Sequence, residues 1–171
     1  MTDTAPIADG LDHQLDPRVI PLEQITGSIS MAVMSVGSAI GIGILSLAGD
    51  SVPWWAKGLL WILWLVLVGL AFWHARSWPA RAYRHTHYRV DDQGLEVRRG
   101  VFWRVVINVP RSRVQHIDVS QGPLERRYGL GTLVIYTAGT DHARVEIGGL
   151  EHGRALRIRE HLLPSGAGDA V

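Results

Sequence analysis

The chain has 171 residues, a formal net charge of +1 and no cysteine. The absence of cysteine excludes disulfides, thiolate zinc sites and cysteine nucleophiles. Charged residues are unevenly distributed, because the stretch 25–73 contains only Asp50 and Lys57. An ordinary soluble globule does not leave so long a stretch almost without charge. The stretch is typical of a segment dissolved in lipid.

Residues 1–24 carry five acidic side chains against Arg18 alone. We expect them to form a cytoplasmic N-terminal tail, of which about the first 15 residues are disordered. The first predicted transmembrane helix follows at 25–47, a stretch without any charge. At about 1.5 Å per residue, this helix crosses a hydrocarbon core of ~30 Å with some tilt.

The second predicted transmembrane helix covers residues 54–74, with Lys57 near enough to its end to reach the interface. The link between the spans, 48–53, contains the turn formers Gly49, Asp50 and Pro53. Because the link is so short, the two helices must be antiparallel neighbours. The sequence therefore predicts a transmembrane hairpin.

Basic residues near the ends of the spans predict the orientation of the hairpin. They are concentrated away from the short link, at Arg18, Arg76, Arg81, Arg84 and Arg89. By the positive-inside rule, we expect a multi-pass protein of the cell membrane with both termini in the cytoplasm.

Tryptophans cluster at both predicted boundaries of the second span, with Trp54 and Trp55 at one end and Trp73 and Trp78 at the other. We interpret them as belts at the membrane interface. The alternative is that these side chains are only apolar filler.

Gly37 and Gly41 fit the close-packing pattern Gly-x-x-x-Gly in the first span. We expect them to pack against the second helix of the same chain, and contact with a second copy is the alternative. Neither span carries a buried acid, histidine or arginine, which argues against a proton relay or a self-contained transporter.

After residue 84 the pattern changes to short alternating segments, which predicts a cytoplasmic β-domain over 85–163. The predicted strands are 85–90, 95–98, 102–109, 114–121, 132–137 and a strand that includes Ala143, Val145 and Ile147. Leu95 and Val97 are expected to point inward, as are Ala143, Val145 and Ile147. A helical turn is expected after Gly122, and an amphipathic helix over 151–163 carries Ala155, Ile158 and Leu162 on one face. This predicts an α+β membrane protein with an antiparallel sandwich or barrel capped by a C-terminal helix. Residues 164–171 are expected to be disordered.

The run from Val109 to Leu133 resembles the bacterial pleckstrin-homology-like (PH-like) membrane proteins of the YdbS type, in which a two-helix hairpin precedes one such domain. The residues that carry the resemblance are Arg111, Gln115, Ile117, Gly122, Glu125, Arg126, Gly129 and Leu133. The resemblance covers about residues 15–163. It implies a seven-stranded sandwich or barrel with a C-terminal helix. Since the residue pattern supports only about six strands, we expect the remaining strand near 85–89.

His116, Asp118 and Ser120 include the three residue types of a hydrolase triad. On a strand, alternate residues lie about 6.6–7 Å apart. A triad needs contacts of about 2.6–3.2 Å, so we interpret these side chains as a polar outer face.

His85 and His87 share a predicted strand face and could ligate a metal together with His116 or His142. No carboxylate is placed to complete such a site, so we expect ordinary surface histidines. We therefore predict no catalytic residues, no metal, no cofactor and no enzymatic activity.

The domain over 85–163 holds 12 arginines against 9 acids. Among the arginines in turns, we expect Arg111, Arg113, Arg126 and Arg127 to contact a partner or lipid. The leading hypothesis is an accessory or scaffold protein that assembles at the inner leaflet with itself or with a related multi-domain PH-like membrane protein. The alternatives are recognition of anionic lipid headgroups and a regulatory subunit of a membrane enzyme or exporter. The charge excess is too small to favour nucleic acid.

Overall fold

The computed structural model describes residues 7–48, 52–138 and 144–163. The chain forms two compact units. The helical unit is Glu23–Pro79, and the β-unit combines Met1–Leu22 with Ala80–Val171. The β-unit is therefore built from two separated parts of the chain.

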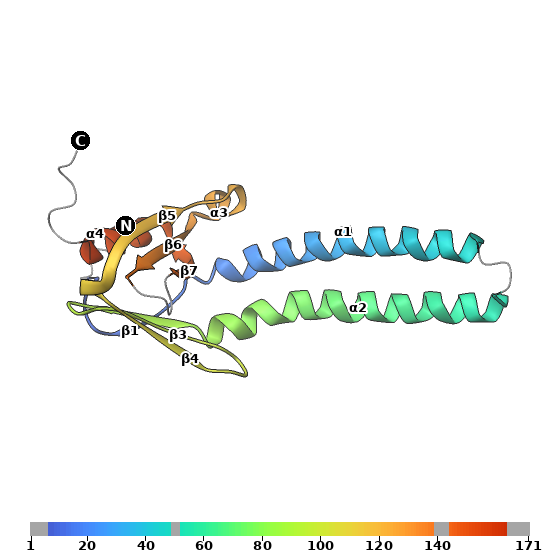
Figure 1. Cartoon of the computed structure of the whole chain (residues 1–171), viewed down its shortest axis with the longest axis horizontal. Coiled ribbons are helices and arrows are strands. Elements are labelled where there is room, and N and C mark those ends of the chain that lie inside the picture. The colour runs from blue at the N-terminus through green and yellow to red at the C-terminus, as the bar shows by residue number, and fades with distance from the viewer. Residues whose placement is uncertain (1–6, 49–51, 139–143, 164–171) are drawn as a thin grey trace. The chain divides into compact units, whose positions relative to one another are not determined.

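Two long helices, α1 (Val19–Ala48) and α2 (Trp54–Arg84), run side by side in the helical unit (Figure 1). The first residues of α1 and the last residues of α2 are assigned to the β-unit. They have 30 and 31 residues, which corresponds to about 45 Å each. Both are long and apolar enough to cross a membrane. The predicted hairpin is confirmed, and its helices are longer than the predicted spans 25–47 and 54–74.

Polar contacts join α1 to α2. Trp64 Nε1 donates to Ser38 Oγ at 3.0 Å. The Lys57 ammonium donates to the carbonyl oxygen of Ser46 at 2.6 Å, where the C-terminal end of the α1 dipole favours a cation. These contacts fix the register of the two helices.

The expected packing of Gly37 and Gly41 against α2 is wrong. A Cβ added at either glycine would meet nothing within 4 Å. The close approach lies instead at Gly27, where an added Cβ would be 3.5 Å from the Cβ of Ala75. A Gly-x-x-x-Gly pattern marks a small-residue face but does not say which neighbour uses it. Contact of Gly37 and Gly41 with a second copy stays a prediction.

The β-unit contains two antiparallel sheets. The four-stranded sheet has the order β1 (Asp12–Gln14), β2 (His87–Asp91), β3 (Gly94–Arg99) and β4 (Val105–Pro110). The three-stranded sheet has the order β5 (Val114–Ser120), β6 (Leu130–Thr137) and β7 (Arg144–Glu151). The 3₁₀-helix η1 (Arg111–Arg113) joins the sheets, α3 (Pro123–Tyr128) lies between β5 and β6, and α4 (His152–Leu162) follows β7.

The core of the β-unit lies between the sheets and under α4. Leu133 and Ile135 of the central strand β6 are fully buried. Ala155, Ile158 and Leu162 of α4 are also fully buried and pack in the same cluster. These three α4 residues follow the predicted helical spacing, so the predicted capping helix and the predicted fold class are confirmed.

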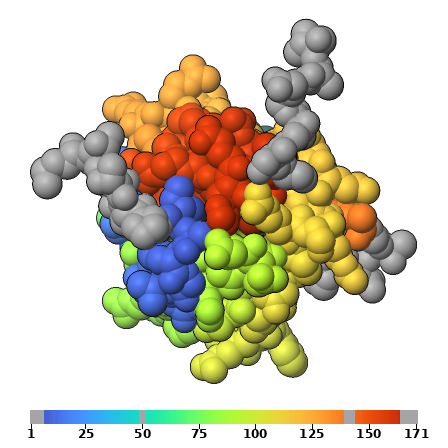
Figure 2. All heavy atoms as spheres, turned by 90° about the vertical axis from the view of Figure 1, so that its left-hand side faces the viewer, coloured from blue at the N-terminus to red at the C-terminus, as the bar shows by residue number. Residues whose placement is uncertain are grey.

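The expectation of disorder near the N-terminus is wrong for residues 7–15. β1 pairs with β2, with His13 opposite Tyr88. Ile7, Ala8 and Leu15 pack against the core, and the blue N-terminal segment lies beside a green segment and the red α4 in Figure 2. This strand is too short and polar to show an alternating pattern. It supplies the seventh strand, which does not lie at 85–89 as expected.

Because β1 precedes α1 and β2 follows α2, the helical hairpin is inserted between the first two strands of the β-unit. At the start of α1, Asp16 N donates to the carbonyl oxygen of Gly149 at 2.9 Å. Gly149 has φ +76°, and an added Cβ there would lie 2.6 Å from Val19 Cγ2. Glycine at 149 thus lets the end of β7 approach the first residue of α1.

The strand predicted over 102–109 begins only at Val105. Arg99 pairs with Val105, so residues 100–104 form the turn of the β3–β4 hairpin. Gly100 adopts φ +125°, and an added Cβ would lie 1.7 Å from the carbonyl oxygen of Trp103. The turn therefore requires glycine and exposes residues that the apolar pattern assigned to a strand.

Candidate functional site

The four predicted contact arginines do not form one site. Arg111 and Arg113 belong to η1 before β5, and Arg126 and Arg127 belong to α3 after it. The seven residues of β5 separate the two pairs by about 20 Å. Each pair must therefore be considered separately.

Arg111 and Arg113 have different surroundings. Arg111 is half-buried, and its Nη2 donates to the carbonyl oxygen of Leu163 at 3.1 Å, just beyond the end of α4. A cation is favourable there because the last carbonyls of a helix are unpaired and carry partial negative charge. Arg113 is exposed and makes no ion pair with any residue that the structure describes.

The α3 turn is held rigidly by Glu125. Its Oε2 accepts from Gly122 N at 2.6 Å and its Oε1 accepts from Thr132 Oγ1 at 2.7 Å. Gly129 ends α3 in the left-handed conformation with φ +69°. Its carbonyl oxygen accepts from His152 N at 3.0 Å. Hydrogen bonds therefore fasten α3 to β6 and to the start of α4.

Arg126 and Arg127 project from this fixed turn. Both are exposed and make no ion pair among the described residues. Other residues that carry the family resemblance have internal roles: Ile117 and Leu133 are buried, and Glu125 fastens α3. Arg126 has no such role within the described chain, which makes it available for an external contact.

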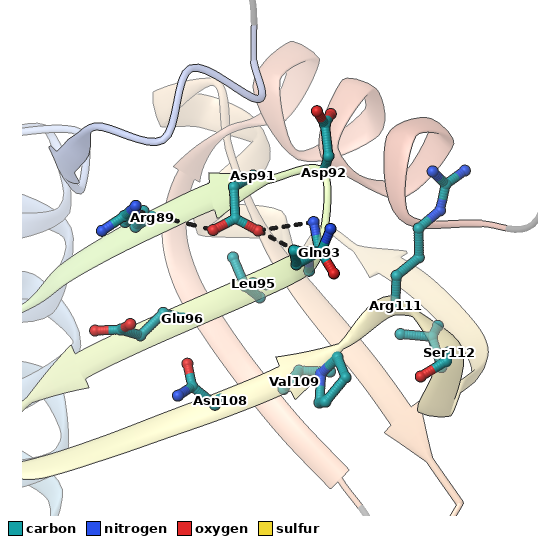
Figure 3. Close-up of a pocket in the computed structure, with 13 residues that line it drawn as sticks. Arg89, Asp91, Asp92, Gln93, Leu95, Glu96, Asn108, Val109, Arg111 and Ser112 are labelled. Atoms are coloured by element: carbon teal, nitrogen blue, oxygen red, sulfur yellow. Dashed lines mark hydrogen bonds and ion pairs between the residues drawn. The ribbon is translucent and has the colours of Figure 1, made fainter.

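An open pocket of about 780 Å³ lies at the β2–β3 turn (Figure 3). Asp91 Oδ1 accepts from the backbone N of Gln93 and of Gly94, at 2.9 and 3.0 Å. Arg89 Nε lies 4.0 Å from Asp91 Oδ2. Glu96 also lines the pocket, while the side chain of Arg111 points toward α4. Both signs of charge are present, so the lining selects no simple anion or cation.

His116 and Asp118 interact more closely than expected. Their side chains lean together, and His116 Nε2 lies 2.6 Å from Asp118 Oδ1. The pair is exposed on the outer face of β5. Ser120 hydrogen-bonds to neither side chain in the described structure, so the three residues are not arranged as a triad.

The histidines considered as metal ligands, and expected instead to be ordinary surface residues, are His85 and His87 with His116 or His142. His87 Nε2 lies 3.2 Å from Gln14 Nε2, a hydrogen-bonding distance, and His142 lies outside the described residues. The described ranges contain no group of three or more potential ligand residues suited to a metal ion.

Trp54, Trp55 and Trp73 are exposed on α2, and Trp78 stacks on His74 with ring centroids 5.2 Å apart. The rise from Trp54 to Trp73 in this helix is about 28 Å, close to the hydrocarbon thickness of ~30 Å. This spacing supports the interfacial interpretation, which stays a prediction.

Sequence reasoning missed the exposed aromatic pair Phe102 and Trp103 in the β3–β4 turn. The signal was the run Arg-Arg-Gly-Val-Phe-Trp-Arg over 98–104, in which arginines flank two aromatic residues and a glycine. Its apolar residues were assigned to a strand because they continue into the apolar start of β4.

The four-stranded and three-stranded sheets with α4 form a PH-like domain, and the two apolar helices make the chain a membrane protein. The family model described as "Bacterial PH domain" matches residues 41–165, so the chain belongs to this family. The resemblance to bacterial PH-like proteins is thereby confirmed.

The chain is similar to the UPF0699 transmembrane protein YdbS of Bacillus subtilis (strain 168), with 34% identity over 110 residues. The alignment covers 64% of this chain and spans only 65% of the length of that relative. No solved structure matches the chain significantly.

Proposed function

We propose that the chain is a non-enzymatic accessory or scaffold protein of the cell membrane, with both termini cytoplasmic and its PH-like domain at the inner leaflet. In this proposal Arg126 and Arg127 bind an acidic surface of another protein. The partner is a second copy or a related multi-domain PH-like membrane protein. The observation that carries the proposal is a pair of exposed arginines on a helical turn fixed by Glu125.

The rigidity of α3 supports a role in binding. A surface that is already ordered loses little conformational entropy when it binds. Arginine is enriched at protein interfaces, where its planar guanidinium can form two hydrogen bonds with one carboxylate. The neighbouring Leu124 is also exposed and can add an apolar contact beside the two charges.

The insertion of the hairpin between β1 and β2 supports a role at the membrane surface. The PH-like domain is covalently linked to the helical unit at both ends of the hairpin. A domain held in this way can only meet partners that are at, or come to, the same membrane.

The test is affinity purification of the full chain in mild detergent, followed by quantitative mass spectrometry. The double variant Arg126→Glu, Arg127→Glu should lose the partner while the protein remains in the membrane fraction. Arg113→Glu is the control, because it reverses an exposed, unpaired arginine at the other end of β5. Equal partner recovery from the double variant and the unmodified chain would contradict the proposal.

Recognition of anionic lipid is a second candidate function. The specific observation in its favour is the aromatic and basic turn of the β3–β4 hairpin, which differs from α3 in position and chemistry. The two sites are compatible with each other in one membrane-bound protein.

A further inference from the structure

We propose that the β3–β4 tip, residues 100–104, enters the headgroup region of an anionic bilayer, the bilayer that the helical hairpin spans. The proposed ligand is the lipid surface itself. The aromatic side chains would lie at the level of the headgroups, and the flanking arginines would contact lipid phosphates. This inference does not depend on the proposed partner of α3.

The tip exposes large apolar side chains. Phe102 and Trp103 are 81% and 87% exposed, and Val105 and Val106 beside them are 42% and 58% exposed. Outside α1 and α2, the only other exposed large hydrophobic residues in the described chain are Leu11, Val52 and Leu124. Tryptophan and phenylalanine have a large apolar area, and the indole N–H can still bond to water or a headgroup. Clustered exposure of this kind marks an interaction surface.

The charge around the tip favours an anionic surface. Arg99 and Arg104 flank the turn and make no ion pair with any described residue. The nearby acids Asp12 and Glu96 both pair with Arg98. No acid occurs from residue 97 to 117, so nothing in that run neutralises the two free guanidinium groups. Basic residues close to a membrane are attracted by the negative potential of its lipids.

The strand register shows at which end of the strands of the four-stranded sheet the tip lies. His87, the first residue of β2, pairs with Arg98 near the end of β3. Only residues 85 and 86 separate α2 from β2. The residues that follow α2 therefore enter β2 at the same end of the strands as the tip. The β2–β3 turn at Gln93 lies at the opposite end of the strands.

The shape of the tip is set before it meets any ligand. Gly100 has φ +125°, and the space beside its Cα is filled by the carbonyl oxygen of Trp103. Only glycine fits that backbone position without strain. A tip that is already folded loses little further conformational freedom when it inserts.

The experiment uses nitroxide labels on the full chain in nanodiscs. The chain contains no cysteine, so Phe102→Cys and Gln93→Cys each give one labelling position. Accessibility to oxygen, which concentrates in the bilayer, is compared with accessibility to a water-soluble nickel chelate. The bilayers contain phosphatidylcholine alone or mixed with phosphatidylglycerol.

In the anionic bilayer we expect the label at 102 to favour oxygen and the label at 93 to favour the nickel chelate. Adding Trp103→Ser, or Arg99→Gln with Arg104→Gln, should move the ratio at 102 toward the value at 93. Added salt should act in the same direction as the arginine substitutions, because it screens their attraction to the lipid.

Three results would overturn the proposal. The first is an aqueous ratio at 102 in the anionic bilayer, equal to that at 93. The second is equal insertion of the tip into bilayers with and without phosphatidylglycerol. This result would contradict the proposed attraction of the arginines to anionic lipid. The third is a label at 102 that neither oxygen nor the nickel chelate can reach when the chain is in detergent without lipid. Protein would then cover the tip, and the tip would be assigned to a protein contact.

Discussion

Arg111 and Arg113 lie two residues apart in η1, yet only the side chain of Arg111 has a hydrogen-bond partner recorded within the described chain. Its guanidinium caps the end of α4 through the carbonyl oxygen of Leu163. The sequence shows both residues as arginines in a turn, because this contact joins positions 52 residues apart. Side-chain roles that depend on such distant contacts cannot be predicted from local pattern.

This difference gives a prediction for stability. Arg111→Met should lower the free energy of unfolding by about 0.5–1.5 kcal/mol, the usual contribution of one hydrogen bond. Arg113→Met should change it by less than about 0.5 kcal/mol, as expected for an exposed side chain. Urea unfolding in detergent, followed by near-ultraviolet circular dichroism, measures both. Equal losses in the two variants would contradict the capping role of Arg111.

Core residues were more predictable than contact residues. Leu95, Val97, Val145 and Ile147 were all expected to point inward, and all are buried. Alternation along a strand follows from backbone geometry alone, so it can be read without knowing the neighbours. Whether an exposed arginine binds a partner depends on another molecule, and no periodicity encodes that.

At the scale of elements, most helices and strands were predicted because their apolar periodicity is regular. β1 and the β3–β4 turn were not. The strand Asp12–Gln14 has only three polar residues, and it forms because β2 offers it an edge to pair with. The turn was hidden because Val101–Trp103 and Val105–Ile107 make an almost continuous apolar run.

The N-terminal segment gives a prediction at this scale. Leu15 packs against the core, whereas Leu11 is exposed, so the two leucines form a matched pair. Leu15→Asp should lower the free energy of unfolding by about 1–3 kcal/mol, and Leu11→Asp should change it by no more than about 0.5 kcal/mol. The same unfolding measurement applies. If both variants were as stable as the unmodified chain, the N-terminal segment would not be part of the folded domain.

The same finding affects how the domain should be studied. A fragment that starts at residue 85 lacks β1 and exposes the edge of β2 that β1 covers. An uncovered strand edge is a site for aggregation. Binding experiments on the PH-like domain therefore need the full chain, as in the two tests above.

For the whole molecule, the proposed orientation can be measured in intact cells. Single cysteines at Val52, between the helices, and at Gln93, in the β2–β3 turn, are introduced into the cysteine-free chain. A membrane-impermeant maleimide should label residue 52 but not residue 93, because the positive-inside rule predicts that the arginine-rich part lies in the cytoplasm.

Both positions should react after the cells are broken, which controls for accessibility of the two side chains. Labelling of residue 93 in intact cells would place the PH-like domain outside and would remove the basis for contact with the inner leaflet.

The split of the β-unit around the hairpin also determines when this protein can fold during synthesis. Gln14 emerges from the ribosome 73 residues before its neighbour His87, a delay of about 4–15 s at bacterial translation rates. Throughout that interval β1 has no partner strand, while both helices of the hairpin are synthesised. A chain that ends within the hairpin therefore lacks β2 and cannot form the β1–β2 pair of the β-unit.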